Sequence, residues 1–208
     1  MNLVVIHVET TGDYTGHSVA ENNVLYVGAK RLCEDSGRLL SAFDTYVKPE
    51  WQGLIPLRKF RHEMFKDLTG FSYFTDEDFD GLPTVAEALM ELSSFVGNAT
   101  IISQYCPMKD MPVIREKCAR NRLPVRHVRM IDLLDMSRIL LPGKADVSLG
   151  GLALHFGIVR DKASPPCAGS YLQILWEVSK SMWALLPPGE ELSEVLCGYG
   201  VLPVIEPY

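Results

Sequence analysis

Short apolar runs rich in β-branched residues open the chain. Residues 3–8 form such a run, and Thr10, Thr11 and Gly12 end it, which is typical of a buried strand that leads into a turn. Residues 24–30 continue in the same style, and residues 42–47 alternate apolar and polar positions. Because no helical pattern separates these three predicted strands, loops join them and part of the sheet is antiparallel.

The pattern then changes to helical spacing. Thr84, followed three residues later by Glu87, has the form of a capping box, and it predicts a helix over residues 84–96. Residues 100–103 and 128–132 have the pattern of a fourth and a fifth strand. Further helices are predicted over residues 111–120, 133–140, 149–156 and 170–186, the third of them capped by Ser148.

These elements predict an α/β fold with a five-stranded mixed sheet flanked by helices. We place the main domain at residues 1–186, because Pro187 and Pro188 end the last helix. Residues 187–208 then form a C-terminal extension. Its apolar run, from Val201 to Ile205, must pack on the body of the protein or on a protein partner.

Composition excludes several classes of protein. The chain has 208 residues, of which 47% are hydrophobic and 22% charged, as in a compact globular domain. Its longest apolar runs are far shorter than the ~20 residues of a bilayer span, so we expect no membrane contact. The first residues enter a strand without the features of a signal peptide, which predicts a cytoplasmic protein. Five scattered cysteines predict reduced thiols rather than a disulfide framework.

The charge is acidic overall but unevenly distributed. Twenty Lys and Arg residues against 26 Asp and Glu residues give a net charge of -6, which argues against a protein that grips nucleic acid mainly by non-specific charge. Six basic residues nevertheless lie between Arg115 and Arg129. This stretch predicts either a local basic face or an ordinary solvated helix surface.

The candidate chemistry begins on the first predicted strand. His7 and Glu9 are two residues apart, so their side chains project from the same face of that strand. Together with Thr10, Thr11 and Gly12, this segment resembles the first motif of the DEDDh-type 3'-5' exonucleases, the superfamily of ribonuclease T and the proofreading subunit of bacterial DNA polymerase III. That motif reads Asp-x-Glu-Thr-Thr-Gly. His7 therefore stands where the family has its first aspartate.

The resemblance extends from residue 3 to about residue 183 and implies a ribonuclease H-like fold. Asp110 matches the aspartate of the family's second motif. In the third motif, Ser164 stands in place of the histidine that acts as general base, and Gly169 in place of the last aspartate. Two of the family's four metal-binding carboxylates and its general base are therefore missing.

By this resemblance, Glu9, Asp110 and His7 are the candidate catalytic and metal-binding residues, with Mg²⁺ or Mn²⁺ as the cofactor, or none. The family uses two divalent metals, whose charge two carboxylates do not offset. A serine without its own base does not take up a proton at neutral pH, and loss of a general base typically costs ~100- to 10,000-fold in rate. We therefore expect catalysis to be strongly impaired or lost.

The resemblance also implies contacts with a single-stranded DNA or RNA end. Thr10, Thr11 and Gly12 correspond to residues that border the terminal nucleotide, and Tyr105 is placed to stack on a base. Positive charge for the phosphates would come from the basic stretch, with Arg120, Arg122 and Arg126 as candidates.

Two functions remain open: a 3'-5' exonuclease with an altered metal site, or a non-catalytic module. The module would bind nucleic acid ends, or it would bind a protein, for which the C-terminal tail is the candidate surface. For single residues a structural role is the competing interpretation. His7 would then be a satisfied structural histidine, and Glu9 and Asp110 polar residues at strand ends; Asp13, Asp132 and Asp161 are weaker candidates for a replacement carboxylate.

Overall fold

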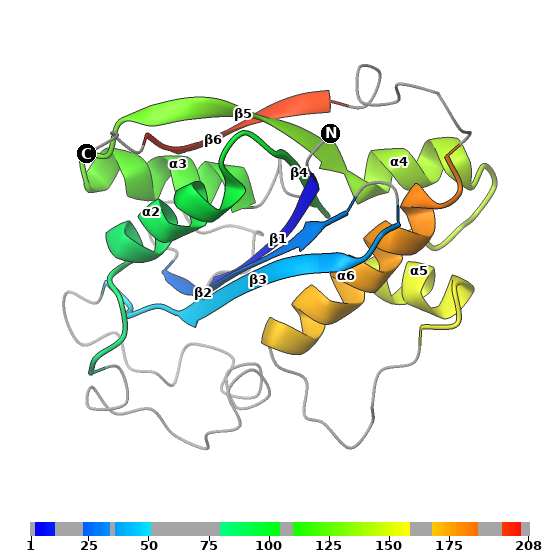
Figure 1. Ribbon diagram of the computed structural model, residues 1–208, viewed down its shortest axis with the longest axis horizontal. Helices are drawn as coiled ribbons and strands as arrows, with labels where there is room; N and C mark the ends of the chain where they lie inside the picture. The colour runs from blue at the N-terminus through cyan, green and yellow to red at the C-terminus, as the bar shows by residue number, and fades with distance from the viewer. Residues whose placement is uncertain are drawn as a thin grey trace.

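The computed structural model describes residues 3–10, 23–33, 36–50, 80–104, 110–158, 168–186 and 197–204. Strands and helices follow in the mixed order that the sequence predicts (Figure 1). The strands are β1 (Leu3–Thr10), β2 (Val24–Leu32), β3 (Leu39–Tyr46), β4 (Thr100–Ser103), β5 (Val125–Asp132) and β6 (Cys197–Pro203). The helices are α2 (Val85–Val96), α3 (Asp110–Arg120), α4 (Leu133–Leu140), α5 (Leu149–His155) and α6 (Ala168–Trp183).

The strands form one mixed sheet in the order β3-β2-β1-β4-β5-β6. Strand β1 pairs antiparallel with β2 and parallel with β4, which in turn pairs parallel with β5. The α/β class and the mixed sheet predicted from the sequence are confirmed. Because β1, β4 and β5 are parallel, their carboxyl ends lie at the same edge of the sheet, where ligand sites of open α/β sheets commonly form.

The prediction of five strands was wrong by one. Strand β6 pairs antiparallel with β5 and completes a sheet of six strands. Leu202 is fully buried there, and a Cβ atom at Gly200 would collide with the side chains of Met130 and Met111. The apolar run near the C-terminus therefore packs within the sheet, which is one of the two outcomes that we expected for it.

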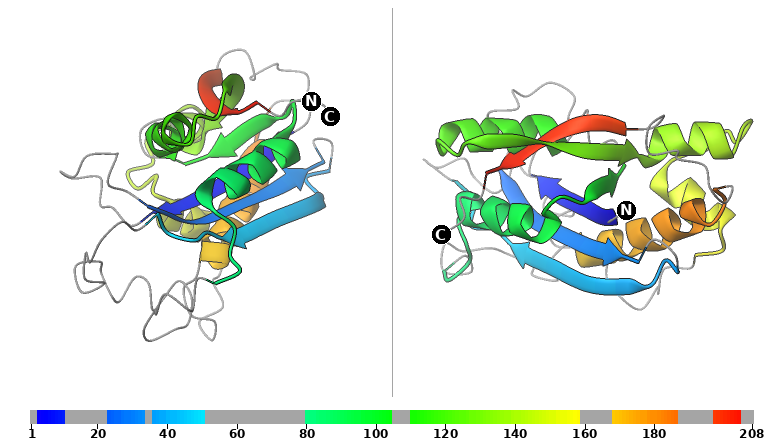
Figure 2. Two further views of the ribbon diagram at one scale, coloured as in Figure 1. Left: turned by 90° about the vertical axis from the view of Figure 1, so that its left-hand side faces the viewer. Right: turned by 45° about the horizontal axis from the view of Figure 1, so that its top comes forward.

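Strand β1 separates two hydrophobic cores. Its even-numbered residues, such as Val4 and Ile6, pack with α2 and α3 on one face of the sheet. Its odd-numbered residues Leu3 and Val5 pack with α4, α5 and α6 on the other face (Figure 2). This alternation follows from the two-residue period of a strand and decides which face His7 and Glu9 reach.

Helix α2 begins as its sequence predicts. The hydroxyl of Thr84 accepts a hydrogen bond from the backbone N–H of Glu87 (3.3 Å), and the Glu87 carboxylate accepts one from the backbone N–H of Thr84 (2.8 Å). The capping box is therefore complete. In the part of the chain that the structure describes, every helix is too short or too polar to span a bilayer.

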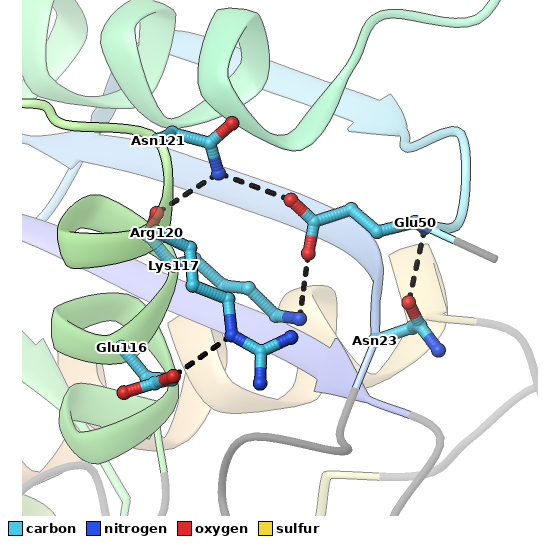
Figure 3. Close-up of polar contacts among 6 residues, drawn as sticks. All are labelled: Asn23, Glu50, Glu116, Lys117, Arg120 and Asn121. Carbon is cyan, nitrogen blue, oxygen red and sulfur yellow. Dashed lines mark hydrogen bonds and ion pairs between the residues drawn. The ribbon is translucent and has the colours of Figure 1, made fainter. Parts of the chain in front are cut away.

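A buried ion pair fastens the end of α3 to the neighbouring loops (Figure 3). Lys117 is 1% exposed, and its Nζ lies 2.7 Å from Oε2 of Glu50. The side chain of Asn121 donates a hydrogen bond to the other oxygen of Glu50 (3.0 Å), while the backbone N–H of Glu50 donates to Asn23 (3.0 Å). Through its carboxylate and its backbone N–H, Glu50 thus connects α3 with the segment that precedes β2.

Burial by itself would raise the pKa of Glu50. Hydrogen bonds from Lys117 and Asn121, and the charge of Lys117, outweigh that effect and hold its pKa below the ordinary value of 4.5. A carboxyl group with a lowered pKa in the folded state stabilises the fold above its unfolded pKa. That contribution is lost as the pH falls through the lower folded pKa.

Replacing Lys117 tests this ion pair. Lys117→Met keeps the volume of the stem but leaves Glu50 without its cation, so we expect the free energy of unfolding to fall by about 2 kcal/mol at neutral pH. The stability advantage of the wild type over Glu50→Gln should shrink as the pH is lowered from about 5 to 3. Urea unfolding across this range measures both effects, and an unchanged difference at every pH would contradict the assignment.

Candidate active site

His7 and Glu9 lie side by side on β1, as the strand period predicts. Nε2 of His7 is 3.3 Å from Oε2 of Glu9, and the side chains are 20% and 18% exposed. The geometry is not that of a hydrogen bond, and Nε2 has no hydrogen-bond partner within the described residues. The pair therefore consists of one carboxylate and one imidazole nitrogen directed at it from the same strand.

Two tyrosine rings lie near His7, and the sequence pattern did not predict them. The centroid of the Tyr26 ring lies 6.2 Å from the His7 ring, and that of Tyr171 lies 6.1 Å from it. Tyr26 in turn meets Tyr46 edge to face at 5.4 Å. The register of β1 with β2, in which Glu9 pairs with Tyr26, is the signal that would have placed Tyr26 here.

Gly28 makes room for this cluster. It pairs with His7 across the β1–β2 ladder. A Cβ atom at this position would lie 2.6 Å from Oη of Tyr26 and 2.7 Å from Cδ2 of Leu172. These distances are too short for real side-chain contacts, so β2 requires glycine for Tyr26 and Leu172 to pack beside His7.

The first turn of α6 lies near the same point. Gly169 is in this turn, two residues before Tyr171, whose ring contacts His7. The resemblance expects an aspartate at the position of Gly169. Gly169 offers no side-chain ligand, and Ser164 lies outside the described residues.

Asp110 begins α3 directly after the fourth strand and a short connection, as predicted, and it is 6% exposed. Helix α3 packs on the even-numbered face of β1, through Met111 and Ile114, whereas His7 and Glu9 project from the odd-numbered face. Among the described residues no three His, Cys, Asp or Glu side chains are grouped to hold a metal ion. Asp110 is therefore not part of a three-ligand cluster with His7 and Glu9.

Asp132 was a weaker candidate for a replacement carboxylate. It stands at the carboxyl end of β5, where its side chain accepts a hydrogen bond from the backbone N–H of Leu134 (2.8 Å). It is the N-cap of α4. This structural role accounts for its position at the edge of the sheet.

Among the described residues, the donors beside His7 do not fit a centre of two divalent metals. Glu9 supplies one carboxylate, His7 supplies an imidazole nitrogen, and Gly169 has no side-chain ligand. Mg²⁺ prefers several oxygen ligands in octahedral geometry, and imidazole suits softer metals. We therefore derive no metal-dependent step from this arrangement.

The candidate basic residues differ in their surroundings. Arg120 forms an ion pair with Glu116 on the same helix (2.8 Å), and Arg122 is exposed. Arg126 directs its guanidinium inward, where it donates to the backbone carbonyl of Ser93 (3.3 Å), and burial lowers its pKa. Lys117, from the same basic stretch, is buried in the ion pair with Glu50. Arg126 and Lys117 therefore do not contribute to an exposed basic face.

The basic residues also lie far from His7. Val5 in β1 and Ile131 in β5 are in register across the sheet, because both pair with Ile102 in β4. Arg126 precedes Ile131 by five residues on β5, and His7 follows Val5 by two on β1. At ~3.3 Å per residue, the two positions are about 20 Å apart along the strands. Of the residues expected near the terminal nucleotide, Thr10 ends β1 and is buried; Thr11, Gly12 and Tyr105 lie outside the described residues.

Curated relatives of the chain are bacterial replication proteins, although no family model matches it. It is 29% identical over 154 residues to the DNA polymerase III subunit epsilon of Aquifex aeolicus, covering 74% of this chain and 67% of that protein. It is 26% identical over 155 residues to the PolC-type DNA polymerase III of Clostridium perfringens. That match covers 74% of this chain but 9% of the much longer relative.

Solved structures of exonucleases share the fold. The nuclease domain of 3'hExo, a DEDDh family member bound to rAMP, aligns with a TM-score of 0.64 at 14% identity, covering 88% of this chain and 92% of that one. Escherichia coli ExoI in its complex with single-stranded DNA aligns with a TM-score of 0.62 at 15% identity, covering 90% and 41%. Together, these matches show that the chain has an exonuclease fold and is similar to proteins of the DEDDh-type 3'-5' exonuclease superfamily.

Gly28→Ala tests the packing around His7. The added methyl group must displace Tyr26 and Leu172, so we expect a loss of about 1–3 kcal/mol in the free energy of unfolding. Gly198→Ala is the matched control, because that strand glycine has open space around its Cβ position. Equal stability losses in chemical denaturation would show that glycine at 28 is not required by its neighbours.

Proposed function

We propose that the chain binds the 3' end of a single-stranded nucleic acid at the carboxyl edge of β1, with little or no cleavage. The observation that carries this proposal is the pair of His7 and Glu9, 3.3 Å apart on one face of β1. In the family motif the position of His7 holds an aspartate. The motif residues Glu9 to Gly12 are present. The segment that borders the terminal nucleotide in the family is therefore retained here, whereas part of the family's set of metal ligands is missing.

Loss of catalysis follows from the charges around His7. Replacing a carboxylate by a neutral imidazole removes one negative charge beside Glu9, and Gly169 removes a second. A metal-bound hydroxide needs several carboxylates to hold its metal, and a proton acceptor to form it. The second candidate is an exonuclease in which His7, Glu9 and Asp110 bind Mg²⁺ or Mn²⁺; it is less favoured, because no group of three such ligands is present among the described residues.

Binding needs less than catalysis does. Backbone groups at the end of β1 can contact a terminal nucleotide without a metal, and stacking on aromatic rings is tolerant of sequence. The exposed guanidinium groups of Arg120 and Arg122 can meet phosphates farther along the strand. A module that binds a protein through its C-terminal tail is less favoured, because Leu202 of that tail is buried in the sheet.

Hydrolysis of a single-stranded oligonucleotide tests the loss of catalysis. With Mg²⁺ or Mn²⁺, we expect mononucleotide release at least ~100-fold slower than by the Aquifex aeolicus epsilon subunit. His7→Asp should not restore activity, because it places a second carboxylate beside Glu9 without restoring the acid at Gly169. Rapid metal-dependent release by the wild type that Glu9→Ala abolishes would favour the active exonuclease instead.

A melting experiment serves as the control for metal binding. A metal that binds the native state must raise its melting temperature. We expect that Mn²⁺ does not raise the melting temperature of the wild type in a saturable way, and that Glu9→Ala therefore does not change the response to Mn²⁺. Such an increase would show that the pair does hold a metal despite its incomplete ligand set.

Binding should depend on oligonucleotide length. At ~3.4 Å per stacked nucleotide, a trinucleotide at the end of β1 does not reach Arg120 or Arg122, whereas a strand of about 12 nucleotides does. We expect the double variant Arg120→Gln/Arg122→Gln to weaken binding of the longer strand and to lower its salt slope by about one, with the trinucleotide unaffected. Fluorescence anisotropy at several salt concentrations measures this.

Arg126→Gln is the matched control, because that guanidinium is engaged with Ser93 rather than with solvent. It should change stability more than affinity. If neither oligonucleotide binds at low salt, the proposed function is wrong. An equal effect of the double variant on both lengths would place the ligand next to the arginines instead of at β1.

A further inference from the structure

Strand β3 leaves one edge of the sheet open. It pairs with β2 on one side only, and no strand in the described part of the chain pairs with its other side (Figure 2). Residues 39–42 and Asp44 are exposed, and Leu39 and Leu40 are 38% and 48% exposed. Within the described residues, the outer edge of β3 therefore has no strand partner, and it carries exposed apolar side chains.

The sequence of β3 has few of the features that usually protect an edge, namely one charged residue and a register shift at its start. It contains no lysine, proline or glycine, and Asp44 is its one charged residue. The opposite edge, β6, carries Gly198, Gly200 and Pro203. The register shift between β2 and β3 falls at the start of β3, so residues 41–46 form a regular ladder.

We propose that β3 pairs antiparallel with β3 of a second copy of this chain, across a two-fold axis at Phe43. The sheets of both copies then become continuous. A symmetric pairing of this kind joins the same surface on both molecules, so the strand must be complementary to itself. This proposal does not depend on the proposed nucleic acid binding.

The register about Phe43 meets that condition. Phe43 lies opposite Phe43, Ala42 opposite Asp44, and Ser41 opposite Thr45, so aromatic and hydroxyl residues meet their own kind. Leu40 and Tyr46, at the two ends, also face each other. Moving the axis one residue further along β3 would place the two Asp44 side chains opposite each other, and moving it one residue back would place Leu40 opposite Asp44. Neither is favourable.

Phe43 also connects this edge with the core. It is half-buried and packs against Phe95 of α2, with 6.0 Å between ring centroids. Part of its surface remains exposed. A second Phe43 opposite it would extend the aromatic packing across the two-fold axis and remove that surface from water. A second copy supplies this complementary sequence in the required register, which an unrelated strand does not.

Charge substitutions at Ala42 test both the pairing and its register. Ala42 is exposed, so its replacement should leave the fold of each copy intact. Ala42→Asp places two like-charge pairs with Asp44 across the axis, and we expect the dimer dissociation constant to rise about tenfold. Ala42→Lys should preserve or strengthen the dimer, and so should Ala42→Asp combined with Asp44→Lys. Leu154→Asp on α5 is the control for the added charge.

Sedimentation equilibrium of the full chain over a range of concentrations measures these constants, with circular dichroism to verify folding. A wild-type dimer that Ala42→Asp weakens and the charge-swapped double variant restores supports the proposal. A protein that is monomeric at every concentration overturns the proposal. This holds both if another segment of this chain covers the edge of β3 and if nothing covers it. A dimer that responds equally to Ala42→Asp and Leu154→Asp also overturns it.

Discussion

The burial of β1 on both faces is the constraint on which the rest of the structure depends. A strand at the centre of a mixed sheet needs apolar side chains at every position that a helix covers. Residues 3 to 6 meet that demand in both directions, toward α2 and α3 on one side and α6 on the other. Polar side chains enter at His7 and Glu9, on the odd-numbered face and near the carboxyl end. The position of the site is therefore a consequence of where the two cores end.

Helix α3 runs from the carboxyl ends of the parallel strands to their amino ends. It starts with Asp110 near the carboxyl ends of the parallel strands and returns to their amino ends, where Lys117 is held by Glu50. A lysine buried in this way stabilises the fold only while its carboxylate stays charged and in place. The same helix therefore carries Asp110 at one edge of the sheet and Arg120 at the other. Proximity of these residues in sequence does not bring them together in space.

Local patterns predicted most of this fold, and pairing between distant segments accounts for what they missed. The capping box at Thr84, the two-residue period of β1 and the glycine stop after α5 all depend on neighbouring residues, and each is present. Strand β6 was missed for two reasons. Gly198 and Gly200 interrupt its alternation of apolar and polar residues, and the strand with which it pairs, β5, is separated from it in the chain by the helices α4, α5 and α6. The aromatic cluster at His7 likewise depends on the register of β1 with β2. Sequence alone gave no such register.

The neighbours of His7 suit an imidazole better than the carboxylate of the family motif. The ring centroids of Tyr26 and Tyr171 lie 6.2 Å and 6.1 Å from that of His7, and their apolar surfaces would desolvate a second carboxylate next to Glu9. A neutral ring, in contrast, packs against other rings and adds no negative charge. Gly28, on the neighbouring strand, leaves space that a larger residue would fill at the expense of Tyr26 and Leu172. Aspartate at position 7 would therefore stand among aromatic rings, and without a side-chain ligand at Gly169 it would not recreate the family's set of metal ligands.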